Sequence, residues 1–400
     1  MGRNTAVEAS LDEVLEVEWA RWCERGLDRV ISPVWHRDGA EVQTAGGRAI
    51  DFATNNYLGL ADDERLVAAA RQALETAGVG AAASRLIHGT HPEHEELERE
   101  VARFFEAPAA LTFNTGYSAN LGAIPALVGP RDAVFADSLN HASMIDGCRL
   151  SRAHLHIYRH ADMSALRALL ASQRSAHERA IIATDGVFSM DGHTAPLTEI
   201  VELAREFNAW TYVDDAHAVG VLGRHGRGTA ELQGVHGSID VTIGTFGKAF
   251  GVAGAFVYGS SSLRRHLENH ARSFVFSTAM LPAQAAAARE SLRIVGGEPT
   301  RRAALAVNVS LLRQGLARRG IRAAGEDGMH IVPVVIGDAG DAMRTGAALR
   351  SRGMLVGAVR PPTVAEGTSR LRICVSAAHT PAHIDALMES MAELLPAIST

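Results

Sequence analysis

Short apolar segments alternate with helical ones through the middle of the chain. The segments that are apolar enough to form buried strands are 109–113, 133–137, 154–158, 180–185, 210–215 and 241–246. Helical patterns separate most of them, as at 163–172 and 197–208. Strands that alternate with helices predict a mostly parallel sheet with helices on both faces. In such sheets, ligands bind beyond the carboxyl ends of the strands.

The flanking segments predict smaller units. An amphipathic helical pattern covers 11–30, with Leu11, Val14, Leu15 and Trp22 toward one side, and a hairpin pattern follows. Near the other end, a long helical pattern precedes apolar strands at 330–336, 354–359 and 370–377. We therefore expect an α/β fold with an N-terminal helix and hairpin segment at 1–50, a large domain at 51–294 and a smaller C-terminal α/β domain at 295–400.

A lysine stands among small residues in the segment GTFGKAFGVAG, at 244–254. Apolar strands precede and follow this segment, so we expect Lys248 in a tight, non-helical crossing between two core strands. Burying a lysine is costly, and a buried lysine with a lowered pKa is suited to forming a Schiff base. The alternative is a glycine-rich turn whose lysine reaches solvent.

A phosphate site is predicted where the strand at 109–113 ends. Gly116 and Tyr117 open a helix there, and a helix N-terminus presents free N–H groups to an anion. Thr245, three residues before Lys248, adds a hydroxyl suited to a phosphate. An ordinary strand-to-helix turn is the alternative for Gly116 and Tyr117.

Side chains at other strand ends suit an aromatic ring. His141 could lie flat on one, and Asp214 could pair with a protonated ring nitrogen, because a carboxylate at the end of a buried strand needs such a partner. His217 and Ser189 could reach a ring oxygen. The alternatives are a surface or helix-capping histidine, a surface turn at 214–215 and a turn serine.

Arg370 and Arg372 alternate on the last strand and therefore point to the same face. A guanidinium aimed into a cleft suits a substrate carboxylate, and a charged outer face of an edge strand is the alternative. Together, the phosphate loop, ring-stacking histidine, carboxylate, lysine and arginine are the parts of a site for pyridoxal 5'-phosphate (PLP).

The composition argues against several other classes of protein. Net charge is −6 and aromatic residues make up 5%, which argues against a nucleic-acid partner. The three cysteines are far apart and form no CxxC pair, which favours free thiols in a reducing cytoplasm. We expect no membrane span, because no apolar run is long enough, and we assign no metal site.

The motifs resemble those of the α-oxoamine synthases, a family of fold-type-I PLP transferases. The resemblance covers about 50–395 and rests on NNYLGL, THPEHEELE, NTGYSAN, NHASMIDG, GVFSMDG, VDDAHAVGVLG, TFGKAFGVAGA, FSTAMLP and PPTVAEGTSRLRICVSAAH. Among the members of the family, the sequence most resembles those that use L-alanine and a pimeloyl thioester in biotin synthesis. His88 and His193 depart from the family pattern, where a hydroxyl residue and an acid are usual.

The resemblance implies roles for individual residues. Lys248 is the Schiff-base lysine and Cα base, with Asp214, His217 and His141 as its catalytic partners on the cofactor ring. Thr278 reaches the phosphate of the partner subunit, which implies a homodimer with shared active sites. The remaining cofactor ligands are Gly116, Tyr117, Ser189 and Thr245, and the substrate ligands are Asn55, Ser84, Thr363 and Arg372.

The implied activity is a decarboxylative condensation of an amino acid, expected to be alanine, with an acyl thioester, expected to be pimeloyl-coenzyme A or pimeloyl-acyl carrier protein. The alternatives within the family are glycine or serine as the amino acid and another acyl chain. An aminotransferase and an inactive regulatory subunit are the alternatives outside it.

Overall fold

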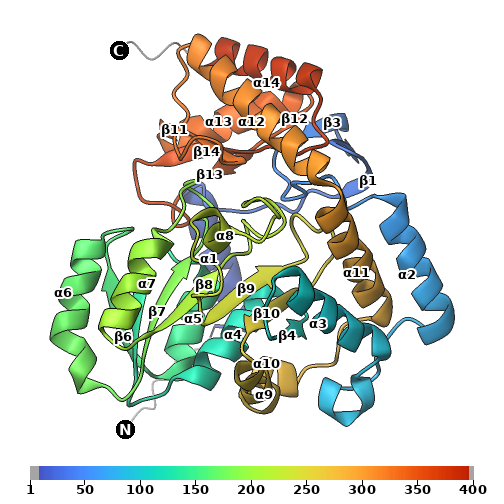
Figure 1. Ribbon diagram of the computed structural model, residues 1–400. Coiled ribbons are helices and arrows are strands. Elements are labelled where there is room, and N and C mark those ends of the chain that lie inside the picture. The colour runs from blue at the N-terminus through green and yellow to red at the C-terminus, as the bar shows by residue number, and fades with distance from the viewer. Residues whose placement is uncertain (1–8, 396–400) are drawn as a thin grey trace, which may run out of the picture.

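The computed structural model describes residues 9–395 (Figure 1). Its largest sheet has seven strands. In spatial order these are β4 (Ala109–Phe113), β10 (Ala255–Gly259), β9 (Val241–Thr245), β8 (Trp210–Asp214), β7 (Ala180–Asp185), β5 (Ala133–Asp137) and β6 (His154–Tyr158). Neighbouring strands are parallel except at β10, which runs antiparallel to both β4 and β9. The predicted mostly parallel sheet is confirmed.

Helices cover both faces of this sheet. One face packs against α4 (Gly116–Leu127), α5 (Ala142–Ser151), α9 (Ser261–His270) and α10 (Arg272–Val275), and the other against α6 (Met163–Gln173) and α7 (Leu197–Glu206). Alternate residues of β5 serve the two cores: Val134 belongs to the first and Phe135 to the second. Burial of both faces explains why these strands are continuously apolar.

Two smaller sheets lie beside the large one. The three-stranded antiparallel sheet has the order β11 (Ile331–Gly337), β14 (Ser369–Cys374) and β13 (Gly357–Val359). With it, at the top of Figure 1, lie α12 (Pro299–Arg318), α13 (Ala339–Ser351) and α14 (Pro381–Leu394). The other sheet contains β1 (Val34–Asp38), β2 (Glu41–Thr44), β3 (Gly47–Asp51) and β12 (Met354–Leu355).

The prediction of one strand at 354–359 is wrong. It is two strands in different sheets: β12 pairs parallel with β3, and β13 pairs antiparallel with β14. Periodicity could not reveal this, because both pieces are apolar and the division depends on partners more than 300 residues apart in one case. The pairing of β3 with β12 joins the N-terminal hairpin to the C-terminal region. The domain boundaries at 50 and 294 stay predictions, and the second falls within α11 (Pro282–Gly297).

The remaining elements are helical. They are α1 (Leu11–Glu24), α2 (Glu64–Ala77), the π-helix Arg85–Gly89, α3 (Pro92–Phe104), the 3-10 helix Arg174–Ala176 and α8 (Thr229–Leu232). Gly78 caps α2 with a φ of 73°, as predicted. The predicted apolar side of α1 is exposed, with none of that helix's residues buried. Within residues 9–395, no helix is both long and apolar enough to cross a bilayer.

One apolar core joins the large sheet to the C-terminal unit. It includes Leu60, Phe246 and Phe250 near the large sheet, and Leu312 and Leu371 from α12 and β14. The loop between β9 and β10 packs tightly on this core. A Cβ at Gly251, whose φ is 69°, would lie 2.6 Å from the backbone at 60–61. The loop that carries Lys248 is therefore held in place by close backbone packing that only glycine permits.

Candidate active site

A cavity of about 340 Å³ opens at the carboxyl ends of the parallel strands. It gathers residues that follow β4, β5, β7, β8 and β9, which is where ligands bind in α/β sheets. Its lining includes most of the residues predicted for cofactor and substrate: Asn55, Gly116, Tyr117, His141, Ser189, Asp214, His217, Thr245 and Lys248.

Lys248 is the only lysine in the chain, since every other residue in the Lys plus Arg total of 39 is an arginine. Burial lowers its pKa to about 8, while the nearby carboxylates of Asp214 and Asp185 oppose that shift. About a tenth of the lysine side chains are therefore neutral amines at pH 7, a far larger share than for an ordinary lysine. An arginine could not supply this form, because a guanidinium stays protonated. The predicted crossing between two core strands is confirmed: β9 ends at Thr245 and β10 begins at Ala255.

Asp214 is fixed by hydrogen bonds at the end of β8. Its Oδ2 accepts from Asn120 Nδ2 at 2.6 Å, and its Oδ1 accepts from the backbone N–H of Ala216 at 3.1 Å. Asp185 lies opposite Asp214 in the β7–β8 register and also lines the cavity. Burial raises the pKa of Asp185 well above its ordinary value, and Asp214 raises it further. These effects favour a neutral Asp185.

In both cavity histidines, the ring Nδ1 atom contacts a hydroxyl group of another residue. His141 caps α5, and its Nδ1 lies 2.7 Å from Ser143 Oγ. Ser143 Oγ in turn accepts from Asn120 Nδ2 at 2.8 Å. His217 Nδ1 lies 2.7 Å from the hydroxyl of Tyr57. Burial lowers the pKa of both imidazoles, and that of His217 falls well below its ordinary value.

The predicted phosphate loop has a shape and donors that fit an anion. Gly116 is the first residue of α4, whose opening turn leaves backbone N–H groups free. A Cβ at Gly116 would lie 2.7 Å from Thr245 Cγ2, so glycine keeps this corner open. The Oγ1 of Thr245 is buried and has no hydrogen-bond partner within the described residues. A phosphate oxygen would satisfy that hydroxyl, so these residues fit the phosphate of PLP.

The predicted carboxylate ligands Asn55 and Arg372 contact each other, and Asn55 lines the cavity. Arg372 Nη2 donates to Asn55 Oδ1 at 3.3 Å, and its Nε donates to the carbonyl of Ser189 at 2.5 Å. Arg370 lies 2.5 Å from Asp191 and does not contact Asn55 within the described residues. Thus only the second arginine of the strand reaches the candidate site. The first fixes the loop that follows Ser189.

Four predicted site residues do not line the cavity: Ser84, Thr278, Thr363 and Arg372. Arg372 contacts the lining residues Asn55 and Ser189, as described above. Ser84 and Thr278 face each other in an isolated antiparallel bridge, and the carbonyl of Thr278 accepts from Asn114 Nδ2 at 2.9 Å. Thr363 is exposed and follows a cis bond between Pro361 and Pro362. Their assignments to substrate and to a partner's cofactor stay predictions.

Three supporting residues were not predicted: Tyr57, Asn120 and Ser143. Each lies inside a motif that was recognised, in NNYLGL, NTGYSAN and NHASMIDG respectively. A polar residue in an apolar helix was the only available signal for Asn120. The single lysine of the chain was a stronger signal for Lys248 than its glycine-rich surroundings.

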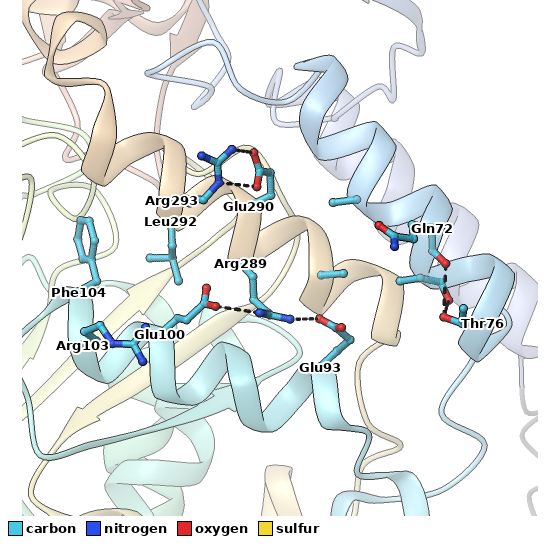
Figure 2. A pocket seen from close by; sticks show the side chains of 13 residues that line it. Gln72, Thr76, Glu93, Glu100, Arg103, Phe104, Arg289, Glu290, Leu292 and Arg293 are labelled. Carbon is cyan, nitrogen blue, oxygen red and sulfur yellow. Dashed lines mark hydrogen bonds and ion pairs between the residues drawn. The ribbon is translucent and has the colours of Figure 1, made fainter.

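A larger cavity of about 600 Å³ lies between α2, α3 and α11 (Figure 2). Except for Arg103, its charged side chains pair with one another: Arg289 lies 2.7 Å from Glu93 and 2.9 Å from Glu100, and Arg293 pairs with Glu290. The described residues that line it include no lysine, histidine or aspartate. The smaller cavity therefore holds the candidate chemistry despite its size.

The chain is similar to known proteins of one family. Residues 48–391 match the family model for class I and II aminotransferases. The chain is 47% identical to 8-amino-7-oxononanoate synthase from Anaeromyxobacter dehalogenans over 93% of both chains. It is 49% identical to the enzyme of that name from Methylococcus capsulatus, over 88% of this chain and 90% of the relative.

The fold matches a solved structure of serine palmitoyltransferase from S. paucimobilis with bound PLP-myriocin. The TM-score is 0.91 at 32% identity, over 96% of this chain and 98% of the other. The chain therefore belongs to the class I and II aminotransferase family and, within it, to the α-oxoamine synthases. It is a PLP-dependent C-acyltransferase.

Proposed function

We propose that this chain is an 8-amino-7-oxononanoate synthase, which joins L-alanine to a pimeloyl thioester and releases CO₂ and the free thiol. The observation that carries the proposal is the meeting, in one cavity, of the only lysine with Asp214, His141, His217 and Asn55, whose amide oxygen accepts from Arg372. Identities of 47–49% to relatives of that name over most of the chain support the choice of substrates.

The chain's own residues divide the chemistry among them. PLP, when bound, stabilises the negative charge that develops at the Cα of the amino acid. Arg372 and Asn55 bind the substrate carboxylate and so orient the Cα–H bond. Lys248, as a neutral amine, removes the Cα proton and later returns a proton to the product. Asp214, oriented by Asn120, would pair with the protonated ring nitrogen of the cofactor, because a buried carboxylate needs a cationic or hydrogen-bonding partner.

The remaining cofactor contacts complete the proposal. Gly116, Tyr117 and Thr245 hold the phosphate, His141 covers the ring, and Ser189 and His217 contact its oxygen. We also propose a cytoplasmic homodimer in which Ser84 and Thr278 serve the partner's cavity. The free thiols of Cys23, Cys148 and Cys374 support a reducing compartment.

A product assay tests the function. The purified, PLP-saturated protein is incubated with alanine, glycine or serine and with pimeloyl, acetyl, succinyl or palmitoyl thioesters, and products are identified by mass spectrometry. We expect the alanine–pimeloyl product to form with the highest kcat/KM, and Lys248→Ala to form none. A preference for serine with palmitoyl thioester would instead support the serine palmitoyltransferase activity of the structural relative. Transamination without thioester consumption would contradict the whole class.

A further inference from the structure

Tyr57 lies behind the candidate site and connects its two ends. Its side chain is fully buried, and its ring packs edge-on against His330 at 4.1 Å between ring centroids. The hydroxyl lies 2.7 Å from His217 Nδ1 and 3.0 Å from Asn55 Oδ1, and the Arg372 guanidinium, which can only donate, is a further neighbour. Tyr57 therefore touches one residue proposed for the cofactor ring and one proposed for the substrate carboxylate.

The orientation of the Asn55 amide follows from its other neighbour. Arg372 Nη2 lies 3.3 Å from Asn55 Oδ1, and a guanidinium can only donate. The amide oxygen must therefore be the atom that faces both Arg372 and Tyr57, since an amide nitrogen there would oppose donor to donor. An oxygen at this position accepts hydrogen bonds and cannot give one.

Counting hydrogens then fixes the protonation of His217. The phenol of Tyr57 has one hydrogen, and Asn55 Oδ1 can only receive it. Tyr57 oxygen must then act as the acceptor in its 2.7 Å contact with His217 Nδ1. For both short contacts to be hydrogen bonds, Nδ1 carries the imidazole hydrogen.

Counting hydrogens around His141 shows that its Nδ1 atom, unlike that of His217, carries no hydrogen. The backbone N–H of Ser143 donates to His141 Nδ1 at 3.3 Å, so that nitrogen must be an acceptor. Ser143 Oγ receives a hydrogen from Asn120 and gives its own to His141 Nδ1 at 2.7 Å. The neutral imidazole of His141 therefore carries its hydrogen on Nε2. The two cavity histidines are held in opposite tautomers.

We infer that Tyr57 is a positioning residue that holds His217 as its Nδ1–H tautomer, so that Nε2 of His217 offers a lone pair to the cavity while Nε2 of His141 offers a hydrogen. His217 Nε2 has no hydrogen-bond partner among residues 9–395. Burial and the nearby cations Lys248 and Arg372 lower the pKa of His217 well below its ordinary value, which keeps the imidazole neutral. His217 Nε2 would then accept a hydrogen bond from a hydroxyl group of the bound ligand. His141 Nε2 would instead donate a hydrogen bond to the ligand. The inference rests on the proposed function only in taking that ligand to be PLP.

The tautomer can be measured directly. In the full chain with ¹⁵N-labelled histidine, two-bond proton–nitrogen correlation spectra distinguish a protonated ring nitrogen from a bare one. The chain has 18 histidines, so the His217 signals are assigned by their absence from His217→Asn. We expect a protonated Nδ1 and a bare Nε2 in wild type, before and after saturation with PLP. A protonated Nε2 with a bare Nδ1 in wild type would overturn the inference without any variant.

Two substitutions should reverse the tautomer for different reasons. Tyr57→Phe removes the acceptor of the Nδ1 hydrogen while keeping the ring against His330, so the hydrogen should move to Nε2 at the cavity. Asn55→Leu removes the acceptor of the Tyr57 hydrogen, which is then free to point at Nδ1 and force the same change. Tyr158→Phe is the matched control, because Tyr158 is also buried and its hydroxyl has no partner within the described residues.

An unchanged His217 spectrum in both folded variants would contradict the inference, and so would the same change in Tyr158→Phe. If Tyr57→Phe does not fold, the wild-type spectrum and Asn55→Leu still decide. The result is separable from the proposed function, because the spectra are recorded without amino acid or thioester. A chain that forms no 8-amino-7-oxononanoate but shows the expected tautomers would keep this inference and lose only the substrates.

Discussion

Asn120 donates an amide hydrogen to Asp214 Oδ2 across 2.6 Å, although the two residues are 94 positions apart. Its second amide hydrogen goes to Ser143 Oγ at 2.8 Å, and its oxygen accepts from the Tyr212 hydroxyl at 2.7 Å. Asn120 is fully buried, and these contacts satisfy both hydrogens of its amide. One side chain thus supports both the carboxylate proposed for the ring nitrogen and, through Ser143, the histidine proposed to cover the ring.

We expect Asn120→Leu to lose stability and activity together. It leaves the Tyr212 hydroxyl and one oxygen of Asp214 buried without their partner, and each unpaired group costs about 1–3 kcal/mol. Urea unfolding measures the change in the free energy of unfolding, and a product assay measures kcat. Tyr212→Phe is the matched control, because it removes one hydrogen bond and leaves the Asn120–Asp214 contact intact. Equal effects of both substitutions on kcat would argue against a role of Asn120 in fixing Asp214.

Because of Lys248, the free energy of unfolding should depend on pH in the alkaline range. Its folded pKa is about 8, against 10.5 ordinarily, because of burial. Below pH 8 the lysine is charged in both the folded and unfolded chains, so the full cost of burying the charge is present. As pH rises from about 8 to 10.5, only the unfolded chain still holds the proton, and the cost is relieved.

Cofactor-free Lys248→Met should therefore exceed wild type in stability by about 3 kcal/mol at neutral pH. The gap should shrink as pH rises through that window. Urea unfolding of both proteins at a series of pH values between 7 and 10 measures it. A gap that stays constant across the series would show that the buried charge is not its origin.

We expect Asp214→Asn to retain PLP but to lose carbanion stabilisation. The amide has nearly the same size as the carboxylate, yet it cannot hold a proton on the ring nitrogen. The exchange rate of the Cα proton of bound alanine should fall by about 100-fold or more. Proton exchange is followed by NMR in deuterated water, and retained PLP by absorbance after gel filtration. Asp185→Asn is the comparison, since burial already favours a neutral Asp185. Wild-type exchange in Asp214→Asn would remove the proposed role.

Ser84→Thr should change the preferred amino acid. Serine in this loop is expected to leave room for the methyl group of alanine, and one added methyl in a tight pocket is worth about 1–3 kcal/mol. The ratio of kcat/KM for alanine over glycine should therefore move toward glycine by about tenfold or more. Ser84 does not line the cavity of its own chain, so this prediction also depends on the proposed homodimer. Equal losses for both amino acids would make Ser84 a structural residue.

Local patterns were sufficient for most of the elements. The strands at 109–113, 133–137, 154–158 and 180–185 lie where the apolar runs predicted them. The hydrophobic periodicity could not predict which strands pair. It therefore missed the division of 354–359 between two sheets. It also predicted an amphipathic α1 without revealing that its apolar side would lie exposed on this chain.

The sequence by itself determined the parallel sheet, the glycine-lined crossing with the only lysine, and the kinds of side chain at the strand ends. These depend on apolar runs, glycine and residue type, which are properties of neighbouring residues. The tertiary structure decided which polar atoms meet: Asn120 with Asp214, and Tyr57 with His217 at 160 positions' separation. Hydrogen bonds need partners within about 3 Å. Only the register of packed strands and helices sets such distances between segments that are remote in the chain.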